Sequence, residues 1–302
     1  MHRRFISIND RYKNPERIPS RCRIAVPSGV GDVYWVLAKL GDFRLQNNLT
    51  HVTLCVQKTT KPRALDWTRL CPQLVDATCE IHFKKDQDLE DKGWSKKIPG
   101  ADFAMWPNSL IDRGHHLSEW MPKYQLDLEL ETQVPVVPDP GIVVYASSHS
   151  VNNAWFPNRG ARWWSTLCAH IKAKTGKEPT LIGAGWDADF AQLITGPHRS
   201  LVGQTSLPAI AATMKQAKLV VGIISGMTIL ANHYRTPCLA IYPDKFLPGF
   251  LTSWIKPNTP YIPLKASDVT TAIEVGDYAL SLLDSNENKA QAVQEGNRTQ
   301  VA

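Results

Sequence analysis

The sequence has few cysteines, and none of them forms a CxxC pair. The six cysteines stand at positions 22, 55, 71, 79, 168 and 238 and make no dense framework. This spacing excludes a small scaffold held together by disulfides. It is typical of buried thiols in a reducing compartment.

Long apolar segments are also missing. The longest apolar run, LVVGIISGMTILA at 219–231, has thirteen residues, whereas a transmembrane helix needs about 20. The first twenty residues are polar and contain no apolar core of a secretory signal. We therefore expect a cytoplasmic protein without a transmembrane segment. Peripheral contact with a membrane stays open.

A long basic tract is absent as well. The net charge is +6, and the charged residues of both signs are spread evenly along the chain. Nucleic-acid-binding domains usually concentrate lysine and arginine on one face or in one segment. The balance is therefore compatible with a phosphorylated or polyanionic partner, DNA included, but does not require one.

The composition is that of a soluble globular protein, and the length predicts two domains. Of the 302 residues, 43% are hydrophobic and 21% are charged. A proline cluster, VPVVPDPG at 134–141, indicates an interdomain linker. We expect an N-terminal domain at 1–135, a C-terminal domain at 136–285 and a disordered polar tail at 286–302.

Strand and helix patterns alternate in both halves, which indicates βα units and parallel sheets. In the first half, strands are predicted at 22–26 and 51–57 and helices at 32–40 and 63–70, while 81–125 is assigned to loops and short helices. The second half repeats the alternation up to a final helix; its strands are predicted at 141–147, 179–185, 218–223 and 237–243, and its helices at 162–176, 206–217, 226–234 and 267–283. The predicted fold class is α/β, with two Rossmann-like domains.

The first predicted strand runs into a glycine loop, PSGVGDVYW at 27–35. It has two glycines of a dinucleotide fingerprint but Tyr34 in place of the third, and no acidic residue ends the second strand, so an NAD site is not favoured. Asp32 follows the loop. It is either a helix-start carboxylate favoured by the helix dipole or a general base at the carboxyl end of a strand.

The second half carries an expected anion site at a Ser-Gly turn. Ser225 and Gly226 open a helix directly after the strand KLVVGI, so that backbone N–H groups and the positive end of the helix dipole can face a pyrophosphate. Gly226 would let a phosphate approach the backbone without meeting a Cβ. An ordinary strand-to-helix turn is the structural alternative.

Further polar residues follow the neighbouring strands. Ser147 and Ser148 end the strand IVVYA and can donate to phosphate oxygens, and Arg159 or Arg162 can add charge-assisted bonds. Asp187 follows the strand TLIGAG and can accept from ribose hydroxyls. Each arginine can equally be a solvated loop residue, and Asp187 a surface acid.

Two segments resemble the lipopolysaccharide heptosyltransferases, which form a glycosyltransferase group (family 9) of GT-B fold. They are PSGVGDVYWVLAKL and SLPAIAATMKQAKLVVGIISGMTILANHYRTPCLAIYP. The resemblance implies two Rossmann-like domains facing a cleft, a nucleotide-sugar donor in the C-terminal one, and an inverting transfer without metal or cofactor. It makes Asp32 the catalytic base, and it implies two groups of contacts, namely an acceptor-side loop of Ser28, Gly29, Gly31 and Trp35 and a donor-side turn of Ser225, Gly226, Met227 and Thr228.

The chain departs from the family at two positions of the donor turn. Ile224 stands where the family has Asp, and Ile229 stands where it has His. A saccharide or lipopolysaccharide acceptor is favoured, with modified DNA bases as an alternative. A non-catalytic nucleotide-sugar-binding protein and a GT-B sugar epimerase also stay open. A metal site at His115 and His116 is not favoured, because adjacent residues point differently on a helix.

Overall fold

The computed structural model describes residues 18–58, 66–83, 98–105, 107, 120–121, 123–130, 139–147, 160–244, 259–268 and 271–283. Ser148, Arg159, the His115–His116 pair and the expected tail at 286–302 lie outside these residues. Within the described ranges, every helix is too short or too polar to span a bilayer.

The chain folds into two compact units, divided between Val134 and Pro135 inside the proline cluster. The first comprises Met1–Val134 with Ser206–Pro208 and Leu247–Trp254, and the second comprises Pro135–Thr205, Ala209–Phe246 and Ile255–Ala302. Within the described ranges each unit contains one sheet, and every strand pairing there is parallel. The predicted α/β class with parallel sheets is confirmed.

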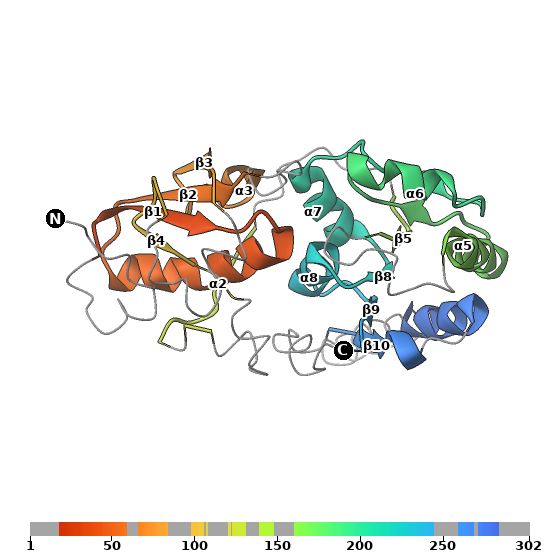
Figure 1. The fold of residues 1–302 in the computed structure, drawn as a ribbon. Coiled ribbons are helices and arrows are strands. Elements are labelled where there is room, and N and C mark those ends of the chain that lie inside the picture. The colour runs from red at the N-terminus through yellow and green to blue at the C-terminus, as the bar shows by residue number, and fades with distance from the viewer. Residues whose placement is uncertain are drawn as a thin grey trace, which may run out of the picture. The chain divides into compact units, whose positions relative to one another are not determined.

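The first unit has a four-stranded sheet in the order β3-β2-β1-β4. Its elements are β1 (Arg21–Val26), α2 (Val30–Gln46), β2 (His51–Gln57), α3 (Trp67–Leu70), β3 (Ala77–Ile81) and β4 (Phe103–Ala104). Strand β2 is buried along most of its length, and β1 is buried from Ile24 to Val26, whereas Arg21 and Arg23 of β1 are exposed. Helix α2 lies along this sheet (Figure 1).

Helix α2 is enclosed on more than one side, since every residue from Val33 to Leu40 is buried. The segment 123–130 also contacts this helix. There the Asp127 N–H donates to the Ala38 carbonyl at 2.8 Å, and the Lys39 ammonium donates to the Tyr124 carbonyl. Burial lowers the pKa of Lys39, opposed by the nearby carboxylate of Asp42. These contacts fix the position of helix α2 and therefore also the position of the residues at its N-terminus.

The second unit has a six-stranded sheet in the order β10-β9-β8-β5-β6-β7. Its strands are β5 (Ile142–Tyr145), β6 (Thr180–Leu181), β7 (Arg199–Ser200), β8 (Leu219–Ile223), β9 (Cys238–Tyr242) and β10 (Tyr261–Lys265). Its helices are α5 (Ala161–Thr175), η6 (Gly185–Asp187), α6 (Ala188–Gln192), α7 (Leu207–Gln216), α8 (Gly226–His233), η7 (Ala266–Asp268) and one at 272–283.

Helix α5 and the helix at 272–283 pack side by side over this sheet (Figure 1). His170 of α5 bonds to the Asp277 carboxylate at 2.8 Å, and this bond and Lys174 lower the pKa of Asp277. The predicted C-terminal glycine of α5 is confirmed, because Gly176 takes the left-handed conformation at φ 71°.

Two predictions of secondary structure were wrong, and the strands β3, β7 and β10 were not among those predicted. Part of the segment 81–125, assigned to loops and short helices, is the strand β4. The edge strand β10 was missed because Pro263 interrupts its pattern, although proline is tolerated in an edge strand. The final helix begins at residue 272 rather than 267, after the short 3-10 turn η7.

Candidate functional site

In the first unit, the loop after β1 delivers Asp32 to the start of α2. Gly29 is the N-cap in an extended conformation (φ −72°, ψ 134°), and no side chain caps the helix there. The Asp32 carboxylate folds back over this residue, because a Cβ on Gly29 would lie 2.8 Å from Oδ2 of Asp32. The carboxylate is half-buried and lies where the positive end of the helix dipole stabilises negative charge.

The other residues of the expected acceptor-side loop lie around this position. Ser28 and Gly31 are half-buried. Trp35 is only 7% exposed and packs edge-on against Tyr34, with ring centroids 5.5 Å apart. This packing gives Trp35 a place in the core of the first unit; contact with an acceptor stays a prediction for all three residues.

In the second unit, the expected donor residues follow two adjacent strands. Strands β5 and β8 pair in parallel, with Tyr145 opposite Gly222. The chain leaves β5 toward β6 on one side and returns to β8 on the other, so this is the point where the strand order reverses. Open α/β sheets bind ligands outside the carboxyl ends of the strands at such a point. Ser147 and Ser225 stand at these two ends.

Ser225, expected at the start of this helix, is the N-cap of α8, and its side chain makes a capping bond that the sequence analysis had not assigned. Its Oγ accepts from the Met227 N–H at 3.0 Å, and Thr228 completes a capping box by accepting from the Ser225 N–H at 3.1 Å. The Ser-x-x-Thr spacing was the available signal, with Thr in place of the usual Glu or Gln.

This capping box reduces the number of groups in the turn that can bind a phosphate. Met227 and Thr228 are buried, and the N–H of Met227 is occupied by the cap. The Ser225 hydroxyl accepts from the Met227 N–H and keeps its own proton for a ligand oxygen. Ser225 and Gly226, both half-buried, are therefore the residues of this turn best placed to meet a phosphate.

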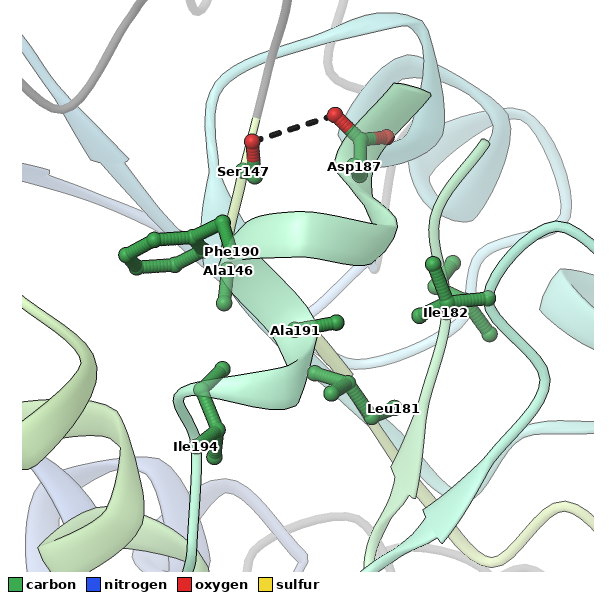
Figure 2. Close-up of a pocket in the computed structure, with 9 residues that line it drawn as sticks. Ala146, Ser147, Leu181, Ile182, Asp187, Phe190, Ala191 and Ile194 are labelled. Carbon is green, nitrogen blue, oxygen red and sulfur yellow. Dashed lines mark hydrogen bonds between the residues drawn. The ribbon is translucent and has the colours of Figure 1, made fainter. Parts of the chain in front are cut away.

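Ser147 and Asp187, both predicted donor contacts, come together but bond to each other. The Ser147 hydroxyl donates to Oδ1 of Asp187 at 3.1 Å (Figure 2), and the Ala184 N–H donates to Oδ2 at 2.7 Å. Asp187 is 5% exposed, so the alternative of a surface acid is wrong. These two bonds make Asp187 a link between the segments that follow β5 and β6. Binding of a ribose hydroxyl by Asp187 stays a prediction.

A small hollow lies beneath this pair (Figure 2). It is lined mainly by apolar side chains from β6, α6 and the flanking turns; they include Ala146, Leu181, Ile182, Phe190, Ala191 and Ile194.

Arg162 is exposed in the first turn of α5, which contains no acidic residue. Since α5 runs back against β5, its N-terminus belongs to the carboxyl edge of the same sheet.

The fold is shared with solved glycosyltransferases. A family 9 glycosyl transferase from Veillonella parvula DSM 2008 matches with a TM-score of 0.53 and 13% identity, over 87% of this chain and 97% of that one. The ADP-heptose LPS heptosyltransferase II of E. coli matches with a TM-score of 0.53 and 12% identity, over 88% and 99%. This chain has the GT-B fold. No protein-family model and no curated protein matches the sequence.

The GT-B fold confirms the resemblance inferred from the two sequence segments at the level of architecture. The two departures in the donor turn are half-buried: Ile224 precedes the cap of α8, and Ile229 lies one turn into the helix. Among the described residues, no three His, Cys, Asp or Glu side chains gather as a metal would require.

Proposed function

We propose that this chain is a glycosyltransferase that moves a sugar from a nucleoside-diphosphate donor to an acceptor hydroxyl. The observation that carries the proposal is the fold match to two glycosyltransferases over 97% and 99% of their lengths. The polar ends of β5 and β8 at the strand-order reversal support it, because that is where such sheets bind nucleotides.

The proposed chemistry is a single inverting displacement. The acceptor oxygen forms a bond to the anomeric carbon as the bond from that carbon to the diphosphate breaks. Asp32 takes the acceptor proton as general base. The N-terminus of α8, with the Ser225 hydroxyl and the Gly226 N–H, stabilises the charge on the leaving diphosphate in place of a metal ion. A chelator is therefore expected to leave turnover unchanged.

A saccharide of the lipopolysaccharide type is the proposed acceptor. The E. coli structure that shares the fold is an LPS heptosyltransferase, and the even spread of charge along this chain does not favour a nucleic acid. Transfer to DNA containing hydroxylated bases, tested in parallel with a lipopolysaccharide core acceptor, separates the two. Transfer to DNA alone would overturn the proposed acceptor while keeping the proposed reaction.

The donor is tested by thermal denaturation with ADP-, UDP- and GDP-linked sugars. A ligand that binds only the native state raises its stability by about 2.7 kcal/mol at one hundred times its Kd. One nucleotide class is expected to raise Tm. If none does, the donor site is wrong; if one does but no acceptor is modified, the chain is a binding protein or, where the donor sugar itself is converted, an epimerase.

A charge change at Ser225 tests the anion site without removing the helix cap. Asp and Asn are both good N-caps, so Ser225→Asp and Ser225→Asn should fold alike. We expect Ser225→Asp to weaken binding of the nucleoside diphosphate at least tenfold, because a carboxylate would face the phosphates, while Ser225→Asn stays near wild type. Calorimetric titration with the diphosphate measures both. Equal affinities would contradict the site.

The loop before α2 offers a test of how Asp32 is positioned. In Gly29→Ala the new Cβ would lie 2.8 Å from Oδ2 of Asp32, so the carboxylate must move. We expect kcat to fall about tenfold or more, since a misplacement of about 1 Å can cost 10²-fold, with little change in stability. The control is Gly41→Ala in helix α2, where the added Cβ would meet no atom closer than 3.5 Å. This variant should leave kcat unchanged. Equal turnover in both variants would contradict the positioning.

A further inference from the structure

Two thiols from separate parts of the sequence meet in the sheet of the first unit. Cys55 of β2 and Cys79 of β3 are register partners on neighbouring parallel strands, so their side chains share one face. Their sulfur atoms are 3.5 Å apart, and both cysteines are free. The fold therefore holds a reduced thiol pair in contact inside a sheet.

The two thiols differ in access and in polar surroundings. Cys55 is wholly buried, whereas Cys79 is half-buried on the edge strand β3. The Arg23 guanidinium donates a hydrogen bond to the Cys79 sulfur at 3.4 Å. Burial, and then the hydrogen bond with Cys79, raises the pKa of Cys55 to about 12.

We infer that Cys55 and Cys79 form an oxidisable dithiol site whose oxidant is a low-molecular-weight disulfide. The Cys79 thiolate attacks the small disulfide, forms a mixed disulfide and releases one small thiol as a thiolate. Cys55 then passes its proton to the small thiolate released in the first step and attacks the Cys79 sulfur as a thiolate. The mixed disulfide breaks and releases the second small thiol as a thiolate, which solvent protonates. Two protein thiols are oxidised to one disulfide and one small disulfide is reduced to two thiols. This inference does not depend on the proposed function.

The geometry permits the bond with little movement of the backbone. Neighbouring strands lie about 4.7–4.9 Å apart, inside the range of Cα separations of about 4.4–6.8 Å found across disulfides. The sulfurs must approach from 3.5 Å to about 2.05 Å, and β2 is the one strand that pairs with β3 among the residues that the structure describes. The surroundings set the order, because Cys79 is half-buried and hydrogen-bonded by the Arg23 guanidinium, whereas Cys55 is fully buried and reacts only after Cys79 carries a leaving group.

The test is oxidation of the folded full-length protein by oxidised glutathione, followed by alkylation and peptide mass spectrometry. We expect two of the six thiols to disappear and a cross-link to join the peptides that contain Cys55 and Cys79. Cys168, whose pKa burial alone raises to about 12, serves as the isolated buried thiol and should react far more slowly. A stable mixed disulfide at Cys79, or reaction no faster than at Cys168, would overturn the inference.

Three variants separate the steps. Cys55→Ser should stop at glutathione attached to Cys79, Cys79→Ser should abolish the rapid reaction, and Arg23→Gln should slow the first step several-fold. Because the wild-type protein alone decides whether the cross-link forms, the inference stays testable even where a variant fails to fold. A rapid reaction in Cys79→Ser would overturn the proposed order.

Discussion

Asp32→Asn is expected to lower kcat by about 10²- to 10⁴-fold, the usual contribution of a positioned general base, with the affinity for the nucleoside-diphosphate donor nearly unchanged. The amide keeps the shape of the carboxylate but cannot take the acceptor proton. Asp32 belongs to the first unit, whereas the proposed donor contacts belong to the second. Single-turnover rates with the donor found in the thermal screen, together with donor titration, measure the two effects separately.

The matched control is Asp42→Asn, which makes the same change on the same helix. Asp42 accepts from the Gln125 backbone N–H and from the Gln46 amide, each at 2.8 Å. Asn can accept the same bonds through its carbonyl oxygen, so turnover should stay close to wild type. If turnover is unchanged in Asp32→Asn, Asp32 is not the general base. Its carboxylate is then a negative charge that stabilises the start of the helix.

The strands that could be predicted from sequence are those buried on both faces. β2, β5, β8 and β9 are mainly continuous apolar runs, and β1 ends in one at Ile24–Val26, which is the pattern of central parallel strands. The edge strands β3 and β10 are only partly buried along most of their length. Half-exposed strands carry mixed polarity, so their sequences do not stand out from loops.

The sequence predicted which residues belong to the candidate site. The structure shows which of them already make hydrogen bonds within the protein. The Ser-Gly turn before α8 was expected as a helix start, but the capping box depends on the side-chain rotamers of Ser225 and Thr228. The bond between Ser147 and Asp187 joins residues 40 positions apart. The Cys55–Cys79 contact likewise depends on strand register. Register follows from the packing of the whole sheet, which local sequence does not specify.

Gly222→Ala is expected to lower stability more than any other substitution proposed above, because Gly222 lies on β8 against β5 where the strand order reverses. An added Cβ would lie 2.7 Å from the Tyr145 carbonyl oxygen and 2.9 Å from its Cβ. A backbone atom cannot turn away as a side chain can, so the two strands must separate. Overpacking of this kind costs about 1–3 kcal/mol, which exceeds the roughly 0.4–1 kcal/mol that Gly→Ala gains by restricting the unfolded chain.

The separation of β5 and β8 would also displace the proposed donor site, because Ser147 and Ser225 follow these two strands. We therefore expect Gly222→Ala to weaken binding of the nucleoside diphosphate as well as to lower the urea midpoint of unfolding. Gly185→Ala is the control in the same unit, because its Cβ would meet nothing within 4 Å, and its stability should stay within about 0.5 kcal/mol of wild type. If both variants unfold at the same urea concentration, the close approach of β5 and β8 does not require glycine. If Gly222→Ala is destabilised but binds the diphosphate as tightly as wild type, the phosphate site is not at this pair of strand ends.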